Sequence, residues 1–200
     1  MRHHGWAVDP TGQVKQRYMQ EIATWTTVDF ADEKFKRAHH TSICVATTMF
    51  GHTRIDTQVQ IALYSLLAGC VDDLEIGHTA LEQFAQRLVS SDSQLHPVLD
   101  LLVERLRLMP NYYPSYSATA IFAGTIQFVN ATLFDWQCEQ QTRMPLQQDA
   151  LPFVRYKRAR NSLGEVYNLF AWDKYNFPDV TAHIQILPCV FLFARLSAIN

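Results

Sequence analysis

Long stretches of the chain contain no helix-breaking residue, and this scarcity is what most constrains the fold. Only 7 glycines and 8 prolines occur among 200 residues, fewer than the many turns of a β-sandwich require. No Asn-Gly or Asp-Gly hairpin is present, and no sustained alternation of apolar and polar residues marks a strand. The sequence therefore predicts an all-α fold of several long helices.

Turn residues and caps divide the chain into predicted helices joined by short connectors. The first helix is expected at about 13–26, and the second runs from an N-cap at 29–32 to about Gly51. The others are expected at 54–76, 79–89, 95–108, 115–138, 153–172 and 178–200. Gly77 is the expected C-cap of the third helix. No repeat or long linker interrupts the chain. We therefore expect residues 1–200 to form a single α-helical domain.

Composition excludes several classes of protein. Apolar residues make up 48 % of the chain, charged residues 18 %, and the net charge is −2; these values exclude intrinsic disorder and a generally basic nucleic-acid binder. The four cysteines lie in apolar stretches without a C-x-x-C pair, and the first residues form no apolar leader. We expect buried free thiols, a cytoplasmic location and no membrane span.

A cluster of carboxylates ends the third predicted helix. Asp72, Asp73 and Glu75 follow the apolar run that ends at Val71. On a helix, Asp72 and Glu75 share a face. Negative charge at a helix C-terminus opposes the macrodipole, and clustered hard oxygens suit Mg²⁺. The cluster therefore indicates a magnesium site, with a solvated helix end as the alternative.

A basic segment follows at residues 155–160, where four of six residues are Arg or Lys. Arg158 and Asn161 share a helix face, and an inward guanidinium is a good diphosphate ligand. A nuclear-localisation or nucleic-acid patch and a solvated basic face are the alternatives.

The two features explain each other if they bind one molecule. Mg²⁺ at the acidic helix end and Arg158 can hold one diphosphate from both sides. Aromatic residues on the apolar helices can line a pocket for an isoprenoid tail and stabilise a carbocation. The candidates are Tyr64, Phe122, Phe128, Phe134, Tyr167 and Phe170.

At this point the sequence resembles the class I terpene cyclases of fungi, specifically the trichodiene synthase family. Four stretches carry the resemblance, at residues 60–73, 113–130, 156–167 and 179–200. They are similar to the helix of the aspartate-rich motif, the following buried helix, the segment of the diphosphate-sensing arginine and the helix before the second metal motif. The resemblance implies a class I terpene synthase-type helical bundle.

The resemblance also implies residue roles. It places Asp72, Asp73, Glu75 and Asn200 as metal ligands, for about three Mg²⁺ ions in an intact family member. It makes Arg158 the catalytic diphosphate sensor, and Asn161, Ser162, Tyr64 and Tyr167 join it in binding substrate. Asn200 follows Asp72 by 128 residues and Arg158 by 42, close to the family's spacings. The implied reaction is cyclisation of a prenyl diphosphate, expected to be farnesyl diphosphate, with release of diphosphate; a homodimer is an open option.

Three positions depart from the family's pattern. Ile76 stands where the family has an acid, so Glu75 is expected to replace it, and Ser162 stands where a glycine is expected. Asn200, the last residue, would begin the second metal motif, so we expect the bundle to be incomplete at the C-terminus.

Two alternatives stay open. One is a non-catalytic truncated or degenerate homologue that acts as a helical binding protein. The other is a prenyl-chain elongating enzyme, which generally needs a second D-D-x-x-D motif.

Overall fold

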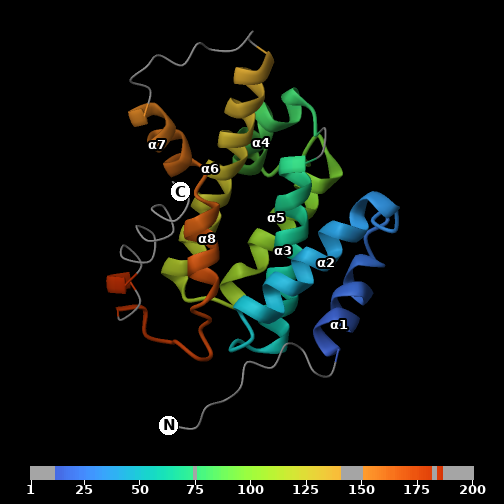
Figure 1. The fold of residues 1–200 in the computed structure, drawn as a ribbon, viewed down its shortest axis with the longest axis vertical. Coiled ribbons are helices and arrows are strands. Elements are labelled where there is room, and N and C mark those ends of the chain that lie inside the picture. The colour runs from blue at the N-terminus through green and yellow to red at the C-terminus, as the bar shows by residue number, and fades with distance from the viewer. Residues whose placement is uncertain (1–11, 74–75, 141–150, 182–183, 187–200) are drawn as a thin grey trace. The chain divides into compact units, whose positions relative to one another are not determined.

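The described part of the protein consists of helices and their connections. The computed structural model describes residues 12–73, 76–140, 151–181 and 184–186, and no β-strand occurs among them (Figure 1). The predicted all-α fold is confirmed. The described residues form two compact units, one of residues up to 73 with 97–108 and one of 76–96 with residues from 109 onward. The single-domain expectation remains a prediction.

Helix α3 (Ile55–Asp73) is the core of the first unit. It packs against α1 (Gln13–Ile22), α2 (Lys36–Cys44) and α5 (Pro97–Leu108), and almost every residue from Thr57 to Val71 is buried. Such a helix is apolar all round, because each of its sides faces protein.

A buried arginine joins three helices of this unit. Arg105 on α5 is 6 % exposed, and its Nη1 donates to Glu21 Oε1 on α1 at 2.9 Å and to Gln60 Oε1 on α3 at 3.4 Å. Its guanidinium also lies 5.7 Å from the centre of the Trp25 ring. A charge in a core needs such partners, so α5 is fixed at one place along α3.

The second predicted helix is wrong as a single element. The structure has a 3₁₀ turn η1 (Glu33–Phe35), then α2, then a π-helical turn η2 (Val45–Met49). The Thr47 and Thr48 hydroxyls donate to the carbonyls of Ile43 and Cys44 at 2.9 and 2.6 Å. Side-chain bonds of this kind compete with the backbone ladder and distort helices.

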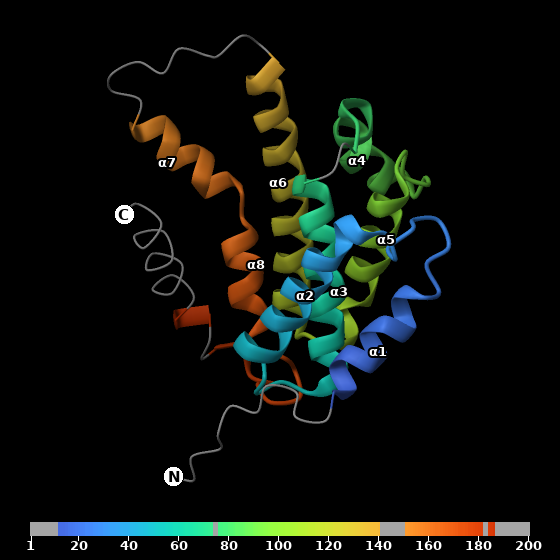
Figure 2. The same ribbon diagram turned by 45° about the vertical axis from the view of Figure 1, so that its right-hand side comes forward.

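Helix α6 (Ser115–Gln140) is the centre of the second unit. It packs against α4 (His78–Ser90), α7 (Leu151–Arg160), α8 (Leu163–Phe170) and the short 3₁₀ turn η3 (Met109–Asn111). Figure 2 shows α8 running beside α6. From Ser115 to Cys138, α6 is long and apolar enough to cross a membrane. The core helix of a soluble protein passes the same test; α6 packs against α4, α7 and α8 within its unit, and 44 % of its most apolar window is buried.

The predicted helix 153–172 is also wrong as one element. The structure breaks it into α7 and α8 at Asn161 and Ser162. Ser162 adopts a left-handed backbone conformation, with φ of 49°, which a continuing α-helix cannot contain.

The other predicted helices are present with small shifts at their ends. The described part of the third helix runs to Asp73, and Ile76, its predicted last residue, is not helical. Gly77, with φ of 88°, precedes α4 instead of capping α3. Most of the predicted helix 178–200 lies outside the described residues. Of the cysteines, Cys44, Cys70 and Cys138 are free thiols, but only Cys70 is buried; Cys189 lies outside the described part.

Candidate functional site

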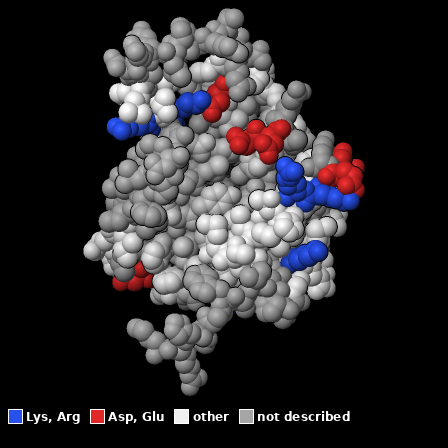
Figure 3. Space-filling view, viewed as in Figure 1, with Lys and Arg blue, Asp and Glu red and all other residues white. Residues whose placement is uncertain are grey.

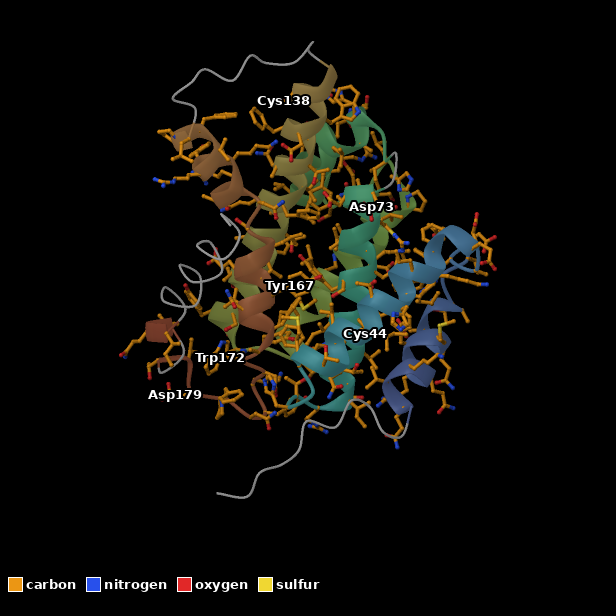
Figure 4. The ribbon with its side chains drawn as sticks, in the orientation of Figure 1. Cys44, Asp73, Cys138, Tyr167, Trp172 and Asp179 are labelled. Carbon is orange, nitrogen blue, oxygen red and sulfur yellow. The ribbon has the colours of Figure 1, made fainter. Side chains whose placement is uncertain are left out.

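The acidic pair lies at the C-terminal end of α3. Asp72 and Asp73 are the last two residues of the helix, and both are exposed; Figure 4 shows Asp73 at this end. The last turn, all of it described, contains no basic residue. Two carboxylates therefore add negative charge to the negative end of the helix dipole, an arrangement that a bound cation stabilises.

The donors at this helix end fit a hard divalent cation. Mg²⁺ is usually held by one or two carboxylates, and its remaining ligands are water and substrate phosphate oxygens. Exposed Asp72 and Asp73 leave room for those ligands. Within the described ranges, no three His, Cys, Asp or Glu side chains gather, and the predicted ligands Glu75 and Asn200 lie outside those ranges.

The predicted diphosphate sensor, Arg158, lies in α7, and its side chain is outside the described part. The helix itself is attached to α6 at two points. Lys157 forms an ion pair with Asp135, and the Phe153 ring meets the Phe134 ring edge-on, with centroids 6.1 Å apart. These contacts fix the rotation of α7 about its axis within the second unit.

Ser162, predicted to bind substrate, forms the sharp junction between α7 and α8. It is 4 % exposed, and its hydroxyl donates to Gln127 Oε1 on α6 at 2.5 Å. The neighbouring Asn161 is half-buried, and its side-chain oxygen accepts a long bond of 3.4 Å from the Leu163 N–H. The left-handed φ at Ser162 is a conformation that glycine adopts without steric cost, which explains why the resemblance predicts glycine at this position.

The two predicted aromatic contacts differ in exposure. Tyr64, on α3, has no exposed surface. Tyr167, on α8 (Figure 4), is half-buried, and its ring meets that of Phe170 edge-on, with centroids 5.7 Å apart. Phe170 also lies 5.7 Å from the ring of Tyr113, so three aromatic rings are in contact at this end of α8.

Sequence reasoning missed two buried polar side chains in the same unit, those of Tyr113 and Asp173. The hydroxyl of Tyr113 is buried and has no hydrogen-bond partner among the described residues. Burial raises the pKa of Tyr113 well above its ordinary value, with smaller contributions from Asp173 and Tyr112, so the phenol stays neutral. Asp173 is fully buried and accepts N–H bonds from Tyr175 and Asn176. The only sequence signal was the position of Tyr113 beside a proline, which predicted a connector.

Comparison with curated proteins gives a consistent family of relatives. The chain is 30 % identical over 184 residues to monoterpene synthase 25 of Postia placenta, covering 90 % of this chain and 53 % of the relative. It is also 30 % identical over 159 residues to terpene synthase 29 of the same fungus, covering 78 % of this chain and 46 % of that relative. The chain is therefore similar to fungal terpene synthases. A third relative, the (E)-beta farnesene synthase of Metarhizium brunneum, is 25 % identical over 79 % of this chain and 48 % of the relative.

The similarity to these relatives covers only part of their length. The chain spans about half the length of the curated relatives that it matches, and no protein-family model matches it. The helical architecture of both units agrees with an all-α terpene synthase fold.

Proposed function

We propose that the protein is a class I terpene cyclase that ionises and cyclises farnesyl diphosphate with Mg²⁺. The exposed Asp72–Asp73 pair at the end of a buried helix carries this proposal, together with homology to fungal terpene synthases. The four stretches that resemble the trichodiene synthase family favour a sesquiterpene product, since that family uses the fifteen-carbon substrate.

Each proposed residue has one task. Asp72 and Asp73, with Glu75 and Asn200, would hold Mg²⁺ and bring the diphosphate to the end of α3. When bound, Mg²⁺ supplies Lewis-acid stabilisation of the leaving diphosphate. Arg158 would donate hydrogen bonds to the same leaving group, where negative charge develops. Asn161, Ser162, Tyr64 and Tyr167 would join Arg158 in binding the substrate.

Two observations weigh against the non-catalytic alternative. A purely structural helical protein gains nothing from placing two exposed carboxylates against the helix dipole. The relatives' names point to synthases of terpenes, not to binding proteins.

Turnover tests the proposal directly. The protein is incubated with farnesyl diphosphate and Mg²⁺, and extracted hydrocarbons and released inorganic pyrophosphate are measured. We expect both products with Mg²⁺, neither after EDTA treatment, and slower turnover of geranyl diphosphate. If pyrophosphate binds in the presence of Mg²⁺ but no hydrocarbon forms, the non-catalytic homologue is the correct description.

Replacing Arg158 by alanine should weaken the binding of diphosphate. A charge-assisted hydrogen bond to a phosphate oxygen is worth enough to lower affinity about tenfold when it is lost. Titration calorimetry with inorganic pyrophosphate and Mg²⁺ measures this change.

Arg160 provides the matched control on the same helix. Its guanidinium lies 5.1 Å from the centre of the exposed Tyr156 ring, so Arg160→Ala should leave the affinity for pyrophosphate unchanged. An equal loss in both variants would mean that α7 attracts pyrophosphate only by its overall charge, and the sensor role of Arg158 would be wrong.

A further inference from the structure

A small polar cluster joins α4 to α6 within the second unit. His78, the first residue of α4, and Glu82 are four residues apart and share one side of that helix. The Nε2 atom of His78 lies 3.2 Å from Oε1 of Glu82. From α6, the amide nitrogen of Gln137 lies 3.4 Å from the same Nε2 atom. We call these three residues the α4–α6 cluster.

A neighbouring ring on α6 orients the imidazole of His78. The imidazole stacks on the indole of Trp136, with ring centroids 4.2 Å apart and planes inclined by 27°. An imidazole held in one orientation directs Nε2 along one line, as the histidines of metal sites do. The cluster is open to water, since the His78 side chain is 28 % exposed and that of Glu82 is 45 % exposed. The α4–α6 cluster therefore combines an oriented nitrogen with access from solvent.

The three groups do not satisfy one another as hydrogen-bond partners. A hydrogen on Nε2 of His78 can be donated to Glu82, but the amide nitrogen of Gln137 then meets another donor. Without that hydrogen, Nε2 accepts from Gln137 but faces the Glu82 oxygen lone pair to lone pair. Reversing the amide leaves two oxygens competing for one hydrogen. No protonation state of the ring gives both neighbours a full hydrogen bond.

A metal ion at this position satisfies all three groups at once. Imidazole nitrogen and carboxylate oxygen bind Zn²⁺ at about 2.0–2.2 Å, so neighbouring ligand atoms of a tetrahedral site lie about 3.3–3.6 Å apart. The distances of 3.2 and 3.4 Å in the cluster are close to this spacing. With its amide reversed, Gln137 places Oε1 where Nε2 lies. Water from the open side can complete the four ligands.

We propose that the α4–α6 cluster binds a divalent transition-metal ion of the Zn²⁺ type. Its ligands are His78 Nε2, Glu82 Oε1 and Gln137 Oε1, and the bound ion ties α4 to α6. The imidazole nitrogen selects such ions over Mg²⁺, which prefers oxygen ligands. The site is independent of the proposed cyclase activity, because it uses none of the carboxylates that Figure 3 shows at the end of α3.

Titration calorimetry of the whole chain with Zn²⁺, in the presence of excess Mg²⁺, tests the proposal. Excess Mg²⁺ competes for sites built from oxygen atoms alone, and we expect a Zn²⁺ binding step that His78→Gln removes. Glu82→Gln and Gln137→Leu should each lower the affinity of that step at least about tenfold, since even groups that only orient a ligand are worth that much. Zn²⁺ should also raise the unfolding temperature of the unchanged protein more than that of His78→Gln, because the ion binds the folded state.

A local reporter and matched controls make the result decisive. Ni²⁺ quenches the fluorescence of a tryptophan beside its ligand, so Ni²⁺ should quench the unchanged protein more than Trp136→Phe or His78→Gln. His52→Gln removes an exposed histidine before α3, and Glu104→Gln removes an exposed carboxylate on α5; both should bind Zn²⁺ like the unchanged protein. A Zn²⁺ titration that is the same in His78→Gln, or equal losses in the controls, overturns the proposal and leaves an ion pair between His78 and Glu82.

Discussion

Replacing Asp72 by asparagine will lower Mg²⁺-dependent turnover of farnesyl diphosphate by at least about 100-fold, a loss of about 2.7 kcal/mol in transition-state stabilisation. The amide has the size of the carboxylate but no negative charge, so it cannot hold a divalent cation at the end of α3. Asp72 is exposed in the last turn of that helix, and the substitution should therefore leave the fold intact. Initial rates as a function of Mg²⁺ concentration measure the effect.

A second measurement separates metal binding from catalysis. Mn²⁺ bound in the presence of inorganic pyrophosphate can be counted by electron paramagnetic resonance, and the Asp72→Asn protein should bind less of it. Glu104→Gln removes an exposed carboxylate on α5, and that control should retain both turnover and Mn²⁺ binding. Undiminished turnover of Asp72→Asn would end the assignment of this residue as a ligand.

Gly124→Ala should destabilise the second unit by about 1–3 kcal/mol, the usual range for overpacking. A Cβ at position 124 on α6 would lie 2.7 Å from Cγ2 of Val166 on α8. Valine cannot rotate away easily, because its branched side chain has one strongly preferred rotamer in a helix. Val166 is also fully buried, so the helices must move apart. Thermal and urea unfolding, followed by circular dichroism, measure the change.

Gly164 on α8 is the matched control, because an added Cβ there meets nothing within 4 Å. Gly164→Ala should stabilise the protein by about 0.5–1 kcal/mol through helix propensity alone. The pair Gly124→Ala and Val166→Ala should be less destabilising than the sum of the single changes, since the second removes the methyl group that the first meets. Additive effects would show that α6 and α8 are not in close contact at Gly124.

Helix positions were largely predictable from the sequence, and the exceptions have local causes. The long apolar runs and the residues at their ends located α3 and α6 to within a few residues. The run in α3 matches its burial on nearly all sides, whereas α6, expected to be buried nearly all round, has 44 % of its most apolar window buried. The break at Ser162 was not predictable from apolar periodicity, because Leu163 and Val166 continue it across the junction. The left-handed backbone there is accompanied by the bond to Gln127, a contact between residues 35 apart in the sequence.

The sequence predicted which residues belong to the candidate site better than it predicted how their side chains are arranged. The sequence located Asp72 and Asp73 at a helix end, and the structure confirms that position; both residues are exposed there. The roles assigned to them, to Arg158 and to the other ligands stay predictions. The buried Tyr113 and Asp173 could not be found from the sequence, since a phenol and a carboxylate in connectors are usually solvated and nothing local shows their burial.

The first unit is assembled from two separated stretches of chain, and this matters for how the protein is made. Helix α3 is complete at residue 73, but α5, which packs against it, ends only at residue 108. During synthesis α3 therefore leaves the ribosome before α5 and exposes apolar residues to chaperones for that interval. A fragment of the protein that ends between residues 76 and 96 lacks Arg105, and therefore lacks the hydrogen bonds that Arg105 donates to Glu21 and Gln60. A stable fragment of this unit consequently has to extend through residue 108.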